Sequence, residues 1–99
     1  MPPLLVLPEI VAASDGMVVM LDSGIRRGTD VLKAIAVGGR ATFIGRPFNY
    51  ASAVAGQAGV AHGIKLIVDE VSRDLGMLGL TELAGLGEGV LVRAAHYQR

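Results

Sequence analysis

Two short apolar runs constrain the fold of this chain more than any other feature. The runs Met17–Leu21 and Ala41–Ile44 are each bounded by turn-forming residues, a pattern typical of strands buried on both faces of a parallel sheet. Parallel strands need a crossover connection, because a tight hairpin joins only antiparallel ones. We therefore expect a strand–helix–strand unit over residues 17–46, with the right-handed connection that such units show.

The segment between the two runs predicts the crossover helix. Thr29 suits the N-cap position, and Asp30 would lie near the positive end of a helix over Asp30–Val37. Gly38-Gly39 would end that helix, because glycine accepts the left-handed conformation that follows many helices. Its expected inner face consists of Val31, Leu32 and Ile35.

Helices are also predicted on both sides of this unit. A short helix over Glu9–Ala13 would enter at Pro8, because proline suits a first helical turn. After the second strand we expect helices over Phe48–Val54 and Val60–Leu78, and a last short one from Thr81–Ala84. The longest carries apolar residues at the three- and four-residue spacing of an amphipathic helix, namely Val60, Ile64, Ile67, Val71, Leu75 and Leu78.

Composition excludes several classes of protein. The 99 residues are 52% hydrophobic and 18% charged, so we expect one ordered domain at most. Nine basic residues balance nine acidic ones, which argues against nucleic acid as a partner. The absence of cysteine excludes disulfides and thiolate chemistry and fits a reducing compartment, so we predict a cytoplasmic location. No long uncharged apolar run and no basic leader occur, so we predict no transmembrane segment and no secretory signal.

Charge is nevertheless uneven along the chain. Residues 22–59 hold five basic side chains against two acidic ones. Two of the basic residues, Arg26 and Arg46, follow the ends of the predicted strands beside Gly24 and Gly45. Ligands bind at the carboxyl ends of parallel strands, and guanidinium groups with free glycine N–H groups suit a phosphate monoester. The alternative is that the arginines are solvated surface charges and the glycines only form turns.

The sequences of these two loops resemble those of a known family. Residues 22–36 and 44–48 look like the C-terminal part of the FMN-dependent α-hydroxy acid dehydrogenases, which include glycolate oxidase, L-lactate dehydrogenase and lactate monooxygenase. The similarity covers residues 7–79. The loop Asp22-Ser23-Gly24-Ile25-Arg26 alone also resembles loops of other flavin and IMP dehydrogenase barrels, but its combination with Gly45-Arg46-Pro47-Phe48 is specific.

The resemblance implies a fold, a cofactor and a site. The fold would be α/β, a C-terminal fragment of a (β/α)8 TIM barrel with its last two strands and their helices, over residues 1–84, and residues 85–99 would form a loosely ordered tail. The cofactor would be FMN, and the parent enzyme would oxidise an L-2-hydroxy acid to the 2-oxo acid. Carried over position by position, the FMN-phosphate residues would be Asp22, Ser23, Gly24, Ile25, Arg26, Gly45 and Arg46.

The family's catalytic histidine and arginine lie in a His-Gly-Gly-Arg type motif that this sequence does not contain. His62 and His96 match no catalytic position of the family, so we expect no catalytic residue here and no activity from the chain alone. We expect a homo-oligomer or association with the missing barrel strands. Two alternatives remain: a non-catalytic remnant or assembly half that needs a partner chain, and the phosphate-binding end of another flavin or IMP-dehydrogenase-like barrel.

Other candidate sites have weaker support. The acidic residues Asp69, Glu70 and Asp74 are interleaved with basic ones on one predicted helix, which favours a solvated face over a metal site. No serine lies in a Gly-x-Ser-x-Gly motif, so a serine hydrolase is not supported. Tyr50 is expected to contribute to packing.

Overall fold

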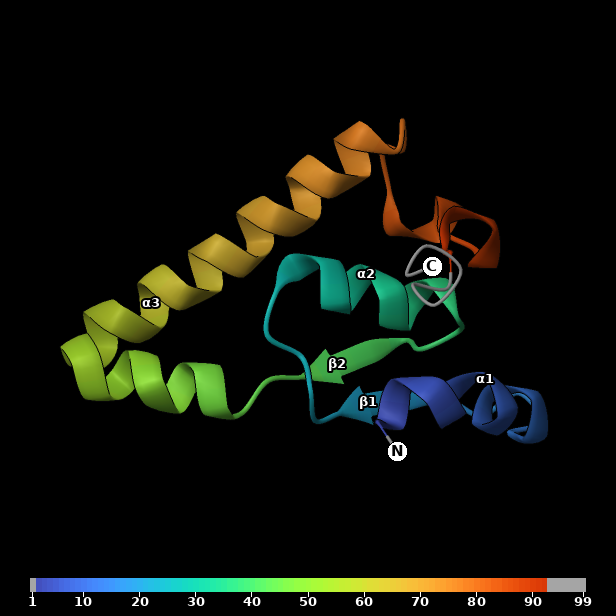
Figure 1. Ribbon diagram of the computed structural model, residues 1–99, viewed down its shortest axis with the longest axis horizontal. Coiled ribbons are helices and arrows are strands. Elements are labelled where there is room, and N and C mark those ends of the chain that lie inside the picture. Colours follow the sequence, from blue (N-terminus) through green and yellow to red (C-terminus); the bar gives the residue numbers. More distant parts are fainter. Residues whose placement is uncertain (1, 93–99) are drawn as a thin grey trace, which may run out of the picture.

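The computed structural model describes residues 2–92, which fold into a small α/β unit (Figure 1). The elements in chain order are α1 (Pro3–Ala13), β1 (Met20–Asp22), α2 (Gly28–Ala36), β2 (Ala41–Phe43), α3 (Arg46–Met77) and two 3-10 turns, Leu83–Gly85 and Glu88–Val90. The two strands are parallel, with Leu21 opposite Thr42. The predicted strand–helix–strand unit is therefore confirmed.

The core lies on one face of the sheet, between the strands and helices α1 and α2. Its buried members are Leu7, Leu21, Ile25 and Ala34. Leu7 of α1 is only 2% exposed. Val31, Leu32 and Ile35 of α2 are buried or half-buried, as their helical spacing predicted. Helix α1 therefore closes the core of the strand–helix–strand unit.

The strands are shorter than expected, and the prediction that both of their faces are buried was wrong. Leu21 is 4% exposed, whereas Met20 and Phe43 are 54% and 53% exposed. Successive residues of a strand point to opposite faces, and the described helices cover only the face that carries Leu21. One apolar face of the sheet is therefore open to solvent.

The starts of α1 and α2 also differ from the predictions. Helix α1 begins at Pro3, so Pro8 lies inside it rather than at its entrance. Helix α2 begins at Gly28, and the N-cap position is taken by Arg27 instead of Thr29. The reason is a carboxylate in the first turn, because one Asp30 oxygen accepts the backbone N–H groups of both Arg26 and Arg27, at 3.0 and 3.1 Å. A carboxylate at the third helical position commonly reaches back in this way to the N–H of the N-cap residue, as in a capping box.

Helix α3 consists of two straight parts joined at a break. Ala55 and Gly56 have non-helical backbone angles, with φ of −147° and +57°, and Figure 1 shows the chain changing direction there. Gly56 tolerates the left-handed conformation because it has no Cβ. The sequence predicted two helices here, over Phe48–Val54 and Val60–Leu78, and the break falls between them. Tyr50, on the first part, is 66% exposed, so its predicted packing role was wrong within this chain.

The apolar stripe of α3 is only partly covered. Val60, Ile67, Val71 and Leu75 are half-buried, whereas Ile64 and Leu78 are exposed. Among the described residues, α3 is one helix long and apolar enough to cross a membrane by length and composition, with mean hydropathy of 1.2 over its best window. Core helices of soluble proteins pass the same test, so the absence of a transmembrane segment stays a prediction.

The end of the described chain contains only short turns. The helix expected from Thr81–Ala84 is a 3-10 turn over Leu83–Gly85, and a second turn covers Glu88–Val90. Part of the predicted loosely ordered tail thus has local structure. Residues 93–99, which include His96, lie outside the described residues.

Candidate functional site

A hollow lies where the two parallel strands end. Both strand arrows in Figure 1 point to this edge of the sheet, from which the chain continues into α2 and α3. The hollow has a volume of about 320 Å³ and is lined by Asp22, Ser23, Gly24, Ile25, Arg26, Phe43, Gly45, Arg46 and Pro47. The structure thus brings together all seven residues that the sequence singled out, and adds Phe43 and Pro47.

The loop after β1 has an unusual backbone. Ser23 and Gly24 have consecutive positive φ values of +88° and +81°. A non-glycine residue in this conformation is strained by about 1–3 kcal/mol and is most often found at functional sites. Ile25 follows with only 5% exposure and belongs to the core. Its side chain therefore anchors the loop rather than offering a group to a ligand.

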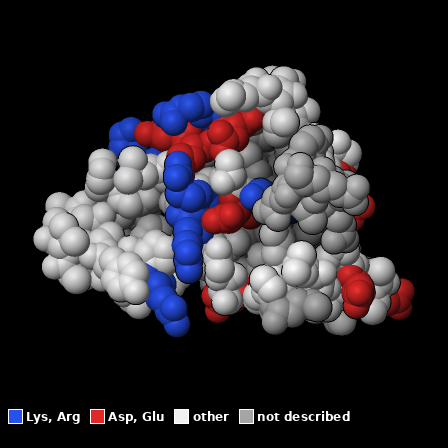
Figure 2. Space-filling view, in the orientation of Figure 1, with Lys and Arg blue, Asp and Glu red and all other residues white. Residues whose placement is uncertain are grey.

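The hollow offers unpaired donors for an anion. Arg26 and Arg46 are exposed, and neither forms an ion pair within residues 2–92. In the same part of the chain, the backbone N–H groups of Gly24 and Gly45 donate no hydrogen bond. Figure 2 shows basic side chains gathered over the region where the strands end and α3 begins. Two guanidinium groups and two backbone donors around one hollow fit a phosphate monoester.

Asp22 lies in the same hollow but has the opposite charge. Its carboxylate can only accept hydrogen bonds, and it would repel a phosphate placed directly against it. It therefore suits a hydroxyl donor next to the anion. The lining as a whole fits a ligand that has both a phosphate and hydroxyl groups.

Glu70 was missed by the sequence analysis, which placed it on a solvated acidic face. Its side chain is only 19% exposed and lies on α3 against the start of α2. One carboxylate oxygen accepts the Nε–H of Arg27 at 2.6 Å, and the other accepts the N–H of Gly28 at 3.0 Å. The Arg27 hydrogen bond is the main cause that lowers the pKa of Glu70, and the same bond raises the pKa of Arg27.

The neighbouring acidic residues behave differently. Asp69 pairs with Lys65 at 2.7 Å on the exposed side of the helix, as a solvated face predicts. Residues 2–92 contain no group of acidic or histidine side chains that could hold a metal ion. His62 is exposed and lies outside the lining of the hollow.

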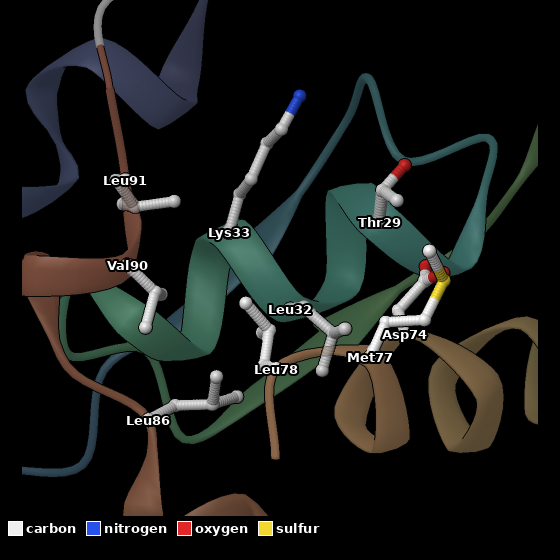
Figure 3. Close-up of a pocket in the computed structure, with 9 residues that line it drawn as sticks. All are labelled: Thr29, Leu32, Lys33, Asp74, Met77, Leu78, Leu86, Val90 and Leu91. Carbon is white, nitrogen blue, oxygen red and sulfur yellow. The ribbon is translucent and has the colours of Figure 1, made fainter. Parts of the chain in front are cut away.

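A second hollow, of about 250 Å³, separates α2 from the end of α3 and the 3-10 turns (Figure 3). It is lined by Thr29, Leu32, Lys33, Asp74, Met77, Leu78, Leu86, Val90 and Leu91. Most of these side chains are aliphatic, and the amino group of Lys33 points away from them. This hollow has no convergent set of polar groups, so it offers no evident chemistry.

The chain is similar to a family of flavin enzymes. Residues 1–93 match the family described as FMN-dependent dehydrogenase. An L-lactate oxidase from Nostoc sp. is 48% identical over 86 residues, which are 86% of this chain and 24% of that protein. Glycolate oxidase 5 from Oryza sativa subsp. japonica is 41% identical over 90 residues, which are 90% of this chain and 24% of the relative.

Solved structures give the same result. An active chimera of (S)-mandelate dehydrogenase superposes with a TM-score of 0.84 at 36% identity, over 88% of this chain and 24% of the other. A mandelate oxidase bound to (S)-2-phenylpropionate superposes with a TM-score of 0.80 at 44% identity, over 84% and 25% of the two chains. The chain therefore spans about a quarter of the length of the proteins it matches.

Proposed function

Because the chain belongs to the FMN-dependent dehydrogenase family, whose cofactor is FMN, we propose that it supplies the part of a flavin enzyme that holds the FMN phosphate. The observation that carries this proposal is the hollow at the strand ends. It combines two exposed arginines that have no ion-pair partner among the described residues with the N–H groups of Gly24 and Gly45.

Each of the seven residues that the sequence singled out has a proposed task in the hollow. Arg26 and Arg46 neutralise the phosphate, and the two glycine N–H groups donate to its oxygens. Asp22 accepts hydrogen bonds from hydroxyl groups of the ribityl chain, and Ile25 fixes the loop from the core side. Ser23 gives the loop its turn. When bound, FMN supplies the site that accepts a hydride equivalent from the substrate.

The proposed substrate of the whole enzyme is a small L-2-hydroxy acid, which is oxidised to the 2-oxo acid. The relatives named L-lactate oxidase and glycolate oxidase support this class. A proton acceptor and a cation for the substrate carboxylate are then needed in addition to the residues of the hollow. His62 does not line the hollow, so we propose that both groups come from outside this 99-residue sequence.

The chain alone is therefore expected not to oxidise L-lactate. The measurement is flavin bleaching and 2-oxo acid formation with purified chain, FMN and L-lactate. The control is the double variant Arg26→Ala/Arg46→Ala under the same conditions. Turnover by the unmodified chain above this control would show that the residues of this chain suffice for the chemistry, and would overturn the proposed division of roles.

A second proposal concerns assembly, and the exposed sheet face supports it. Met20 of β1 and Phe43 of β2 are 54% and 53% exposed, and a two-stranded sheet with open edges is marginal in water. In the proposed barrel, β1 and β2 would be the last two of eight strands, and this face would be covered by the others.

We expect the isolated chain to self-associate through this face, or to need the other strands of the barrel in order to stay soluble. Sedimentation velocity over a range of concentrations measures this directly. The variant Met20→Lys/Phe43→Lys should reduce the association, because it places charge on the open face. A compact monomer at all concentrations would contradict the proposal.

A further inference from the structure

We infer that Glu70, on α3, is a positioning residue that holds the loop bearing Arg26 in place at the hollow. Glu70 does not line the hollow, so it would act through the loop and not by touching a ligand. The inference rests on the proposed function, because holding Arg26 in place affects binding only if an anion occupies the hollow.

The contacts of Glu70 fix both the main chain and a side chain of that loop. One carboxylate oxygen accepts Arg27 Nε–H at 2.6 Å and also contacts a second guanidinium nitrogen, and the other oxygen accepts Gly28 N–H at 3.0 Å. Arg27 comes directly after Arg26 in the chain. A carboxylate that binds two adjacent residues leaves their backbone little freedom.

The close approach of α2 to α3 makes these contacts possible. A Cβ atom at Gly28 would lie 2.5 Å from the Cβ of Glu70 and 2.8 Å from the backbone nitrogen of Val71. Only glycine therefore allows the start of α2 to rest directly on α3. The loop is thus attached to a second helix as well as to its own.

Asp30 fixes the same segment from the other side. Its carboxylate accepts the N–H groups of Arg26 and Arg27, and Ile25 is held in the core. The main chain of Arg26 is therefore constrained on both sides, while its side chain stays free of ion pairs with the described residues. Such preorganisation improves binding, because less freedom remains to be lost when the ligand arrives.

Glu70 also decides which of the two adjacent arginines serves the hollow. The guanidinium of Arg27 is engaged by Glu70, and Arg27 does not line the hollow. Without Glu70, the side chain of Arg27 would be released and the backbone N–H of Gly28 would lose its acceptor. Both changes would loosen the orientation of Arg26.

The test compares Glu70→Gln with Asp69→Asn in the full chain. Glutamine keeps an oxygen for the Gly28 N–H but removes the charge that holds Arg27. Asp69 is the adjacent residue on α3, and among residues 2–92 it pairs with Lys65 alone. We measure FMN affinity by flavin fluorescence and amide hydrogen exchange at residues 23–28. Glu70→Gln should weaken FMN binding about tenfold, as for one impaired charged hydrogen bond, and raise exchange in the loop.

The matched variant Asp69→Asn should change neither quantity by more than about twofold, since surface ion pairs contribute little. Arg27→Ala should reproduce part of the Glu70→Gln defect, and the effects of the two should not add, because both remove the same contact. Riboflavin, which lacks the phosphate, should bind equally to all variants. A purely structural role would instead lower its binding along with that of FMN.

The exchange measurement needs no ligand, so it separates the two proposals. If the unmodified chain binds neither FMN nor inorganic phosphate, the proposed function fails, while loss of loop protection in Glu70→Gln alone would still support positioning of the loop by Glu70. If Glu70→Gln and Asp69→Asn give the same loop protection and the same affinities, the positioning role is overturned.

Discussion

Replacing Arg26 and Arg46 together by alanine is expected to weaken FMN binding at least about 100-fold. A hydrogen bond to a charged group contributes about 1.5–3 kcal/mol, and each 1.4 kcal/mol corresponds to a factor of ten, so each single variant should lose about tenfold or more. Both side chains line the hollow and are exposed. Because salt screens exposed charges, the loss should shrink as ionic strength rises. Flavin fluorescence titrations at low and high salt measure both effects.

Arg40→Ala is the matched control for this experiment. Arg40 is exposed and belongs to the same basic segment, but it does not line the hollow. Its replacement lowers the net charge by the same amount as either single variant. If Arg40→Ala weakened FMN binding as much as Arg26→Ala, the interaction would be one of general charge, and the assignment of the phosphate to the hollow would fail.

Leu7→Ala is expected to cause a large loss of stability. Leu7 is the largest side chain that is fully buried, at 2% exposure, and it joins α1 to the core of the strand–helix–strand unit. Truncation of a buried leucine lowers the free energy of unfolding by about 2–5 kcal/mol, a large share of the 5–15 kcal/mol typical of a folded domain. Urea unfolding followed by circular dichroism measures the change.

Leu5→Ala provides the comparison, because Leu5 lies on the same helix and is 56% exposed. Its replacement should change the free energy of unfolding by less than about 0.5 kcal/mol, since exposed substitutions are usually mild. Equal losses in the two variants would mean that α1 does not pack against the strands as described.

The parts of the fold that the sequence predicted depend on neighbouring residues. The apolar runs, the glycines that bound them and the spacing of Leu32 and Ile35 are local patterns, and they located the strands, α2 and the hollow. Because β1 and β2 pair in parallel, the loops that follow them must lie at the same edge of the sheet, and no other contact is needed to predict this. The position of the hollow could be predicted because it follows from strand order and from loop composition.

The parts that were missed depend on distant residues or on what covers a surface. Glu70 lies more than 40 positions from Arg27, and no local spacing connects the two. Helix α2 starts before Thr29, because the Asp30 carboxylate accepts the N–H groups of Arg26 and Arg27. The exposure of Met20 and Phe43 could not be predicted from an apolar run, since the run does not show which other elements cover it.

The break in α3 has a mechanical consequence. The non-helical angles at Ala55 and Gly56 change the direction of the chain and leave the two parts of α3 packed against each other, since a Cβ atom at Gly63 would lie 3.3 Å from the ring of Phe48. A displacement of Arg46, which begins the first part, would therefore reach the second part through this packing. The hollow is thus connected to the second part of α3 in two ways, by this packing and by the short loop that ends at Gly28, where Glu70 is bound.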